Sequence, residues 1–432
     1  MNIADLYKIF QAFPSIETDT RKIKEGDIFF ALKGPNFNGN LYVKQAFNAG
    51  ASYCVCDEKS DLENANIIYT DDVLITLQAL AKYHREQFEN LSEGRRIPFI
   101  AITGSNGKTT TKELVHEVLS TTYKCYTTKG NLNNHIGIPL TILSVKKDAE
   151  IVVIEMGANH LHEIESYCAY TKPTHGLIAN CGKAHLEGFG GEEGVRKGKG
   201  ELYNYLAETN GTIFINTDYD YLNKMSSAVK NKISYGSSNA TFTGVVKKDN
   251  HFLEIAVTNG AAIDSIKTQL AGSYNLPNIM SAICIGKTFG VKDDAIKNAL
   301  ENYVPSNSRS QIIVKESNTI VLDAYNANPS SMKAAIENFA AMGGDKKIVI
   351  LGGMMELGDE SIAEHNDVIM LLQKYKWHKV AVAGKDYQNL PENILHFNTS
   401  VELADWFKEN HFEKATILIK GSRGMAMEKV IS

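Results

Sequence analysis

The sequence predicts an α/β protein of three domains: a small N-terminal αβ domain, a central P-loop-type parallel sheet with a small antiparallel addition, and a C-terminal Rossmann-like domain. Three observations lead to this prediction. The chain of 432 residues is too long for one compact core. An apolar strand at 99–102 leads through a glycine-rich loop into a helical pattern at 111–119. After that loop, strand candidates alternate with helical stretches toward the C-terminus.

The polar, glycine-containing segment 92–96 predicts a linker after the first domain. We therefore predict domains over residues 1–92, 97–310 and 311–432. In the first of them we expect strands at 27–32 and 51–56 and helices at 43–48 and 74–88. In the last we expect strands at 319–322, 347–351, 379–382 and 415–419.

Composition and charge narrow the class of protein. The net charge of −5 gives no electrostatic footprint for nucleic acid or an anionic membrane surface. The N-terminus lacks the pattern of a signal peptide, and no apolar run approaches the roughly 18 residues of a transmembrane helix. The six cysteines lack C-x-x-C spacing, so we expect small buried hydrophobic side chains rather than zinc ligands or disulfides. A cytoplasmic protein that binds neither nucleic acid nor membrane is expected.

The glycine-rich loop predicts a phosphate-binding site. Glycines let the backbone wrap an anion, and the following helix offers unpaired N–H groups and the positive end of its dipole. Lys108 adds a cation for the outer phosphates, and the Thr109 hydroxyl can bind Mg²⁺. Ile102 stands where the general pattern has glycine, and the alternative is a Gly/Ser-rich turn before an ordinary helix. The loop residues are Gly104, Ser105, Asn106, Gly107, Lys108, Thr109 and Thr110.

Two later strand ends carry candidate metal ligands. The apolar run 151–154 ends in Glu155, which a buried parallel strand would deliver to the edge of the sheet where phosphate loops lie. His185 follows the predicted strand 174–180 on a glycine-rich loop and could bind a metal or orient a phosphate. A surface glutamate and a histidine with neither role are the alternatives. On charge alone, segment 194–201 is expected to be a solvated basic turn or a phosphate contact.

Asparagine clusters supply candidate ligand contacts. Segment 128–139 contains Asn131, Asn133 and Asn134, whose amides could bind carbonyl, hydroxyl or peptide groups or could cap the local backbone. Asn275 and Asn278 lie three residues apart at the start of a helix expected at 279–289. Paired amides suit adenine, whereas N-capping would explain only one of the two. Antiparallel strands are expected just before them, at 241–246 and 252–257.

Both outer domains carry polar clusters of their own. Thr18, Asp19, Thr20 and Arg21 could hold a sugar nucleotide, or could form a solvated turn with a helix cap. In the C-terminal domain the predicted strands end in polar or glycine residues at 323–329, 352–353, 383–385 and 420–424. A Rossmann-like sheet brings such ends to one edge, facing a ligand. Because no G-x-G-x-x-G fingerprint opens a helix there, we do not expect dinucleotide binding.

In this order and number, the motifs resemble the Mur ligase family over essentially the whole chain. The first domain contributes T-D-T-R from Thr18 and G-D-I-F-F-A-L-K-G from Gly26, although Phe37-Asn38-Gly39-Asn40 stands where relatives usually show Asp-Gly-His. The central domain contributes T-G-S-N-G-K-T-T-T-K-E from Thr103, G-N-L-N-N from Gly130, I-G-I-P from Ile136, E-M-G-A-N-H from Glu155 and A-H-L-E from Ala184. The C-terminal domain contributes D-A-Y-N-A-N-P from Asp323, L-G-G-M-M-E-L-G from Leu351 and K-G-S-R from Lys420.

The resemblance implies roles for individual residues. It implies ATP, two Mg²⁺ ions and a carbamylated lysine at Lys199, with Lys108, Glu155, His185 and Lys199 at the reacting centre. Thr109, Glu155, His185 and the carbamate of Lys199 would hold the metal ions. Asn275 and Asn278 would contact adenine, and Arg309, Asp323 and Asn326 would close on ATP. The substrate would be bound by Thr18, Asp19, Thr20, Arg21, Lys33, Gly34, Asn131, Asn133, Asn134, Ser422 and Arg423.

The resemblance also implies the reaction. Mur ligases form amides at the expense of ATP through an acyl phosphate, in the synthesis of peptidoglycan precursors. The order of motifs is most similar to the members that join UDP-MurNAc-tripeptide to D-Ala-D-Ala, so we expect these two small-molecule substrates and a monomer. The alternatives are a ligase of the same build that adds a single amino acid to a muropeptide or glutamate to a folate, and a non-catalytic ATP-binding module. A folate ligase normally lacks an N-terminal domain of this kind.

Overall fold

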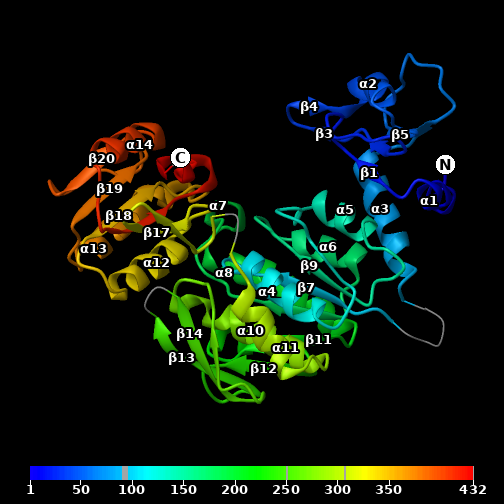
Figure 1. Cartoon of the computed structure of the whole chain (residues 1–432). Coiled ribbons are helices and arrows are strands. Elements are labelled where there is room, and N and C mark those ends of the chain that lie inside the picture. Colours follow the sequence, from blue (N-terminus) through cyan, green and yellow to red (C-terminus); the bar gives the residue numbers. More distant parts are fainter. Residues whose placement is uncertain (90–95, 250–251, 306–307, 432) are drawn as a thin grey trace. The chain divides into compact units, whose positions relative to one another are not determined.

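The computed structural model describes residues 1–89, 96–249, 252–305 and 308–431 (Figure 1). The chain forms two compact units. The first contains Met1–Ile102, Tyr123–Ala158 and His162–Gly176, and the second contains Thr103–Thr122, Asn159–Leu161 and Leu177–Ser432. Strands β7 (Phe99–Thr103) and β10 (His175–Ile178) contribute residues to both. The predicted linker 92–96 lies almost wholly outside the described residues.

The N-terminal part of the first unit is a small αβ domain, as predicted. Its four strands pair in parallel in the order β1-β2-β5-β6. Phe29, Val43 and Cys54 are buried in its core, and the Asp72 carboxylate caps the last helix by accepting from the Ile75 N–H at 2.8 Å. The elements are α1 (Ile3–Ala12), β1 (Ile16–Glu17), β2 (Ile28–Phe30), β3 (Lys33–Gly34), β4 (Phe37–Asn38), η1 (Gly39–Tyr42), α2 (Val43–Asn48), β5 (Tyr53–Cys56), β6 (Ile67–Tyr69) and α3 (Val73–Glu86).

The rest of the first unit is part of a parallel sheet. Strands β8 (Cys125–Thr127), β9 (Ile151–Glu155) and β7 pair in parallel in the order β7-β9-β8. Ile102, near the end of β7, lies opposite Glu155, the last residue of β9. All residues of β7 and β9 are buried, which explains why both read as continuous apolar runs. Helices α5 (Gly137–Leu143) and α6 (Glu163–Thr171) complete the unit.

The second unit begins with the helix that follows the glycine-rich loop, α4 (Lys108–Ser120). Strands β11 (Thr212–Asn216) and β12 (Asn231–Gly236) pair in parallel, and β13 (Phe242–Asp249), β14 (Leu253–Asn259) and β15 (Ser265–Lys267) form an antiparallel meander. The predicted antiparallel addition is thereby confirmed. The helical elements are α7 (Leu186–Phe189), α8 (Glu192–Glu208), α9 (Asp220–Met225), η3 (Ser273–Asn275), α10 (Leu276–Thr288) and α11 (Asp293–Asn302).

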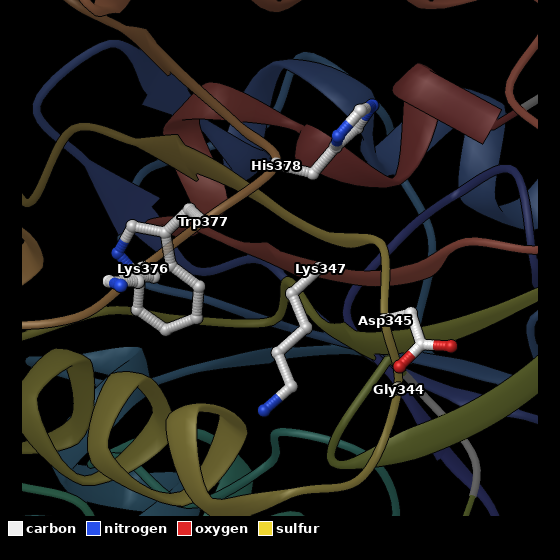
Figure 2. A pocket seen from close by; sticks show the side chains of 6 residues that line it. All are labelled: Gly344, Asp345, Lys347, Lys376, Trp377 and His378. Carbon is white, nitrogen blue, oxygen red and sulfur yellow. The ribbon is translucent and has the colours of Figure 1, made fainter.

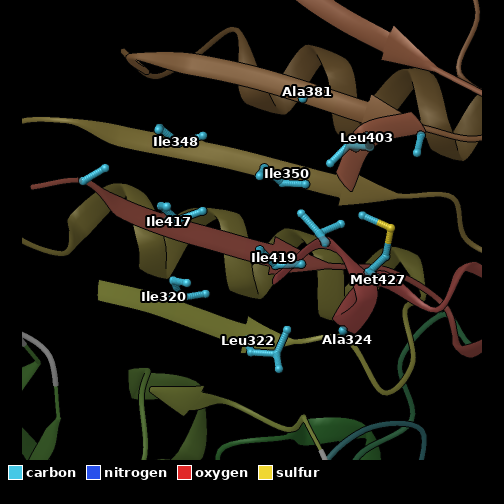
Figure 3. Packing of buried hydrophobic residues seen from close by; sticks show 13 residues of the cluster. Ile320, Leu322, Ala324, Ile348, Ile350, Ala381, Leu403, Ile417, Ile419 and Met427 are labelled. Atoms are coloured by element: carbon cyan, nitrogen blue, oxygen red, sulfur yellow. The ribbon is translucent and has the colours of Figure 1, made fainter. Parts of the chain in front are cut away.

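The C-terminal part has a six-stranded sheet in the order β16-β17-β21-β18-β19-β20, with helices on its faces (Figure 1). Only β16 is antiparallel to its neighbour, so the predicted Rossmann-like build is confirmed. Ile320, Ile350 and Ile419 pack in its core with Leu403 and Met427 (Figure 3). The elements are β16 (Gln311–Lys315), β17 (Asn318–Asp323), α12 (Pro329–Ala341), β18 (Lys347–Gly352), η4 (Gly358–Glu360), α13 (Ser361–Leu372), β19 (Lys379–Ala383), β20 (Ile394–Phe397), α14 (Ser400–Glu409), β21 (Thr416–Lys420), η5 (Arg423–Met425) and η6 (Met427–Ile431).

One local prediction is wrong. Segment 194–201 is not a basic turn, because it lies within helix α8. Glycine disfavours helices, but here a Cβ on Gly198 would lie 2.5 Å from Cε1 of Phe189. Gly194 and Gly198 therefore make room for Phe189 against the helix, a tertiary contact that overrides helix propensity.

The cysteines and the apolarity of the helices bear on two of the predictions made from composition. Within the described ranges the six cysteines form no disulfide, and every one except the half-buried Cys125 is buried, as expected for small hydrophobic side chains. Within the described ranges, no helix is both long and apolar enough to cross a bilayer.

Candidate functional site

The glycine-rich loop joins β7 to α4 and depends on two glycines. Gly104 and Gly107 have φ values of +146° and +78°, which disfavour other residues. A Cβ on Gly107 would also lie 2.7 Å from Oδ1 of Asn278, so the loop packs tightly against that side chain. Helix α4 begins at Lys108, so the backbone N–H groups of its first turn point toward the loop. The strand–loop–helix geometry predicted for phosphate binding is present.

Asn180, just after β10, holds the loop in shape. Its carbonyl accepts from the Ser105 N–H at 2.8 Å, and its side chain both accepts from the Asn106 N–H and donates to the Asn106 carbonyl at 3.0 Å. The Lys108 ammonium donates to the carbonyls of Gly104 and Ser105 at 2.7 and 3.1 Å. Asn180 was not among the predicted site residues; its position at a strand end was the only signal for it in the sequence.

The two asparagines predicted to contact adenine lie together and are buried. Asn278 donates through Nδ2 to Oδ1 of Asn275 at 2.8 Å and accepts at Oδ1 from the Thr111 hydroxyl at 3.0 Å. Asn275 donates to the Ala271 carbonyl at 2.7 Å. Neither side chain caps α10. The capping alternative is therefore excluded, and Asn278 lies directly beside Gly107 of the loop.

Glu155 is a buried carboxylate at the end of β9. Its residue is 1% exposed, and Oε1 accepts from Nδ2 of Asn133 at 2.7 Å. A buried carboxylate is stable only with hydrogen bonds or a cation close by, so the surface-glutamate alternative is excluded. The other predicted amides behave differently: Asn134 accepts from the N–H groups of Ile136 and Gly137, and Asn131 is exposed. Of the three side chains, that of Asn133 is the one that donates to Glu155.

Lys199 and His185 both belong to the second unit, Lys199 within α8 and His185 directly before α7. Lys199 lies on α8 and is 0% exposed, with its ammonium 5.0 Å from the ring centroid of Phe189. His185 precedes α7 in a left-handed conformation, φ +53°. Its Nδ1 is hydrogen-bonded to Oε2 of Glu356, which also has a positive φ of +62°. This contact lowers the pKa of Glu356.

The carboxyl edge of the C-terminal sheet gathers the predicted residues of that domain. Asp323 ends β17 and lies opposite Lys420, which ends β21. The Lys420 ammonium, 1% exposed, donates to the Asp323 carboxylate at 2.6 Å and to the Asn326 carbonyl at 3.2 Å. Lys420 was not predicted as a site residue, although it opens the K-G-S-R motif. It fixes the segment that carries Asp323 and Asn326.

A tyrosine organises the arginines at the same edge. The guanidinium of Arg309 lies 3.7 Å from the centroid of Tyr325, and that of Arg423 lies 5.9 Å from it. Asp323 accepts from the N–H of Ser310, the residue after Arg309, at 3.3 Å. Ser422 is buried, and its hydroxyl has no hydrogen-bond partner among the described residues. Such a hydroxyl remains available to a ligand.

The glycine-rich loop also contacts this C-terminal edge. Asn328, the N-cap of α12, donates to Oδ1 of Asn106 at 2.7 Å, and Asn106 Nδ2 points back to Asn328 Oδ1 at 3.4 Å. Asn328 was not among the predicted residues either. A loop predicted to hold phosphate is thus in direct contact with a C-terminal segment more than 200 residues away in sequence.

In the N-terminal domain both predicted cations have carboxylate partners. Arg21 donates to both oxygens of Asp19 at 2.8 and 2.7 Å, which lowers the pKa of Asp19 to about 2. Lys33 lies 3.0 Å from carboxylate oxygens of both Asp57 and Glu58. Thr18 and Asp19 donate their N–H groups to Glu17. The turn is therefore internally hydrogen-bonded, and the Arg21 side chain is 83% exposed.

A pocket of about 270 Å³ opens at the amino ends of β18 and β19, away from the predicted residues. Figure 2 shows the side chains of Asp345, Lys347 and His378 pointing in different directions. Lys347 donates to the Ala340 carbonyl at 2.7 Å and the Trp377 indole donates to the Leu372 carbonyl at 2.8 Å. Because its polar groups serve the domain itself, this pocket is not a candidate site.

The predicted metal ligands fit magnesium by their chemistry. Within the described ranges, no three His, Cys, Asp or Glu side chains form a group that could hold a metal ion. The predicted set instead relies on the hydroxyl of Thr109 and on an anion made from Lys199. Thr109, Glu155 and Lys199 are all buried, and a buried carboxylate favours a nearby cation. Oxygen donors of this kind suit Mg²⁺.

The fold and site define a class: a multidomain α/β nucleotide-binding protein whose phosphate loop contacts a C-terminal Rossmann-like domain. Comparison with known families agrees. Residues 13–91 match the profile described as "Mur ligase family, catalytic domain", residues 102–286 match "Mur ligase middle domain", and residues 308–423 match "Mur ligase, glutamate ligase domain". The chain belongs to the Mur ligase family.

Individual relatives are similar over their full length. The chain is 34% identical to the UDP-N-acetylmuramoyl-tripeptide–D-alanyl-D-alanine ligase of Bacillus subtilis, covering 100% of this chain and 96% of the relative. The crystal structure of MurF from Acinetobacter baumannii superposes with a TM-score of 0.88 at 28% identity, covering 98% and 97% of the two chains. The MurF ligase of Thermotoga maritima, solved with ADP, gives 0.85 at 26% identity over 96% of each chain.

Proposed function

We propose that this protein is the ATP-dependent ligase that joins the carboxylate of UDP-MurNAc-tripeptide to the amine of D-Ala-D-Ala. The observation that carries the proposal is the full-length similarity to ligases of that name, 34% identical over 100% of the chain. The geometry adds support, because the loop that would hold ATP contacts the C-terminal domain through Asn106 and Asn328. Sheets of this kind bind ligands at the carboxyl edge, where Asp323 and Lys420 lie.

ATP is the nucleotide we assign to the glycine-rich loop. Backbone N–H groups of residues 104–110 would hold the phosphates, with Lys108 neutralising charge on the outer ones. Asn275 and Asn278 would recognise adenine through their paired amides. Arg309, Asp323 and Asn326 would contact the nucleotide from the C-terminal domain. A relative solved with ADP supports this assignment.

The chemistry follows from what the residues can do. The tripeptide carboxylate attacks the γ-phosphorus of ATP, a new P–O bond forms, and ADP leaves. The D-Ala-D-Ala amine then attacks the acyl carbon and loses a proton. The bond between that carbon and the phosphate oxygen breaks, and phosphate leaves with the electron pair. Because two anions meet in the first step, cationic groups must offset their charge, and Lys108 is placed on the loop for this. Contact with the C-terminal domain would exclude water from the acyl phosphate.

We propose that Thr109, Glu155, His185 and a carbamate on Lys199 hold magnesium. When bound, Mg²⁺ would neutralise phosphate oxygens and orient the reactants. Carbamylation, in which the neutral Lys199 amine adds CO₂ and loses a proton, would turn a buried cation into an oxygen ligand. His185 has Nε2 available for this purpose, because Nδ1 is engaged by Glu356.

The substrate sites and domain limits complete the proposal. The UDP group would lie on the N-terminal domain at Thr18–Arg21, Lys33 and Gly34, and the peptide would be held by Asn131, Asn133, Asn134, Ser422 and Arg423. We place the domains at 1–92, 97–310 and 311–432, which the three matched family ranges support. We also propose that the protein works as a cytoplasmic monomer, where ATP and the UDP-linked precursor are available.

A substrate panel tests the proposed function. Phosphate release is measured with ATP, UDP-MurNAc-tripeptide and either D-Ala-D-Ala or a single amino acid. We expect release only with the dipeptide. Turnover with a single amino acid would point instead to another ligase of the same build, and phosphate release without any amine would show an ATPase. Running the panel with tripeptides ending in L-lysine and in meso-diaminopimelate identifies the third residue of the tripeptide that the enzyme uses.

A further inference from the structure

The loop between β10 and α7, residues 179–185, contacts two helices of the C-terminal domain at one residue, Lys183. The Lys183 N–H donates to the hydroxyl of Ser330 on α12 at 2.8 Å. Its ammonium donates to Oε1 of Glu364 on α13 at 2.6 Å. Lys183, Ser330 and Glu364 are not among the site residues described above. Their contacts nevertheless join the loop to helices α12 and α13 of the C-terminal domain.

The ion pair differs from an ordinary surface pair, because its carboxylate is buried. The Glu364 side chain is 7% exposed and that of Lys183 is 38% exposed. Glu364 lies in the first turn of α13, where the helix dipole favours a negative charge. Without Lys183, a buried carboxylate would lose its cation, which costs much more than losing an exposed pair.

Helix α13 is itself anchored to the loop that carries Glu356. The buried His365, next to Glu364, accepts from the Met354 N–H at Nε2, 2.9 Å away, and donates from Nδ1 to the Ser361 carbonyl at 2.7 Å. Burial lowers the pKa of His365, consistent with a neutral ring in these roles. Helix α13 therefore holds both the partner of Lys183 and the loop whose Glu356 contacts His185.

His185 lies only two residues after Lys183. An extended dipeptide reaches about 7 Å, so a fixed Lys183 confines the position of His185. His185 and Glu356 each adopt positive φ values, a conformation that persists only where surrounding contacts hold it. The contacts of Lys183 provide such support from the C-terminal domain.

We propose that Lys183 and Glu364 form a latch that holds the 179–185 loop, and with it His185, against α12 and α13 during turnover. Lys183 is thus a positioning residue for the ligase reaction, and this role rests on the proposed function. In this role it acts through the loop.

The first test separates binding from turnover. Lys183→Met keeps the aliphatic stem, and Glu364→Gln keeps the side-chain shape. We expect each variant to lower kcat about tenfold, because small misplacements at a reacting centre are costly. The Kd for ATP should stay within about twofold, because the glycine-rich loop is intact. Lys374→Met, at an exposed position just after the end of α13, is the matched control and should behave as wild type.

The second test asks whether the two residues act on each other. The double variant Lys183→Met/Glu364→Gln should be no slower than the worse single variant, and Lys183→Arg should recover kcat to within about threefold of wild type. Additive losses in the double variant, or an arginine no better than methionine, would overturn the latch. Thermal unfolding of every variant verifies that lost activity does not reflect lost fold.

A third measurement does not depend on ligase activity. Amide hydrogen exchange in residues 180–186 should be faster in Lys183→Met and Glu364→Gln than in wild type and Lys374→Met. Unchanged exchange would refute the latch even if the enzyme is a ligase. Conversely, faster exchange together with a wild-type protein that fails the substrate panel would refute the proposed function and leave the latch standing.

Discussion

At the scale of single residues, burial decides which of several similar side chains forms a hydrogen bond with another predicted site residue. Asn131, Asn133 and Asn134 look alike in the sequence, but only Asn133 donates to the buried Glu155. Asn134 caps the local backbone, the role that asparagines most often have in turns. A chemical role therefore depends on where the neighbouring strand places its carboxylate.

Asn133→Ala should destabilise the protein. The buried Glu155 carboxylate would lose a donor that lies 2.7 Å away, which costs about 1–3 kcal/mol. Chemical denaturation measures the change. Asn131→Ala, at an exposed position, should change the free energy of unfolding by less than about 0.5 kcal/mol. Equal effects of the two substitutions would contradict the assigned contact.

The carboxyl group of Asp19 should titrate near pH 2, well below its ordinary value of 3.8, because Arg21 donates to both of its oxygens. Since the pKa is lowered on folding, the stabilising contact is present above about pH 4 and is lost as the pH falls toward 2. Carboxyl NMR of Asp19 measures the midpoint. In Arg21→Gln it should move toward 3.8, and an unmoved midpoint would exclude Arg21 as the cause.

At the scale of elements, the phosphate loop is a strand–turn–helix unit whose glycines are required by close contacts. Gly107→Ala would place a Cβ 2.7 Å from Asn278 at a φ of +78°. The resulting strain of about 1–3 kcal/mol should weaken ATP binding roughly tenfold or more. Calorimetric titration with ATP measures the change in Kd. Gly343→Ala, where the added Cβ meets nothing within 4 Å, should bind ATP like wild type.

Helix α6 depends on a buried arginine from α3. Arg85 is 0% exposed, donates to the carbonyls of Thr171 and Lys172 at 2.8 Å, and lies 3.9 Å from the ring centroid of Phe99. Arg85→Met should cost about 2–4 kcal/mol of unfolding free energy, because two carbonyls at the helix end lose charged donors. Arg85→Lys should recover little, since one ammonium cannot reproduce the planar fork. Chemical denaturation measures the free energy of unfolding of both variants, with Arg96→Met, at a half-exposed position, as the control.

At the scale of the whole molecule, the proposed ligase reaction requires groups that lie far apart in sequence. Lys199→Ala should reduce phosphate release at least about 100-fold, because a proposed metal ligand would be lost. The Kd for ATP should change by less than about threefold, since the glycine-rich loop is untouched. A coupled phosphate assay measures the rate of phosphate release, and ATP titration measures the Kd. If Lys199→Ala keeps full turnover, the carbamate proposal fails.

Much of the architecture could be predicted because buried parallel strands are apolar along their length. The runs at 99–102, 151–154 and 347–351 all form strands. Strands β16 and β20 were missed, since both lie at the edges of their sheet and are only partly buried. Helix α8 was missed because Gly194 and Gly198 make room for Phe189, a contact that no local pattern reveals.

The sequence by itself determined the class of fold, the phosphate loop and the family, because these depend on local patterns and on the order of motifs. Only the tertiary structure decided which polar groups meet: Asn180 and Asn328 with Asn106, Asn133 with Glu155, Lys420 with Asp323, and Lys183 with Glu364. The physical reason is that a hydrogen bond needs atoms about 3 Å apart, and chain folding brings such atoms together across tens to hundreds of residues.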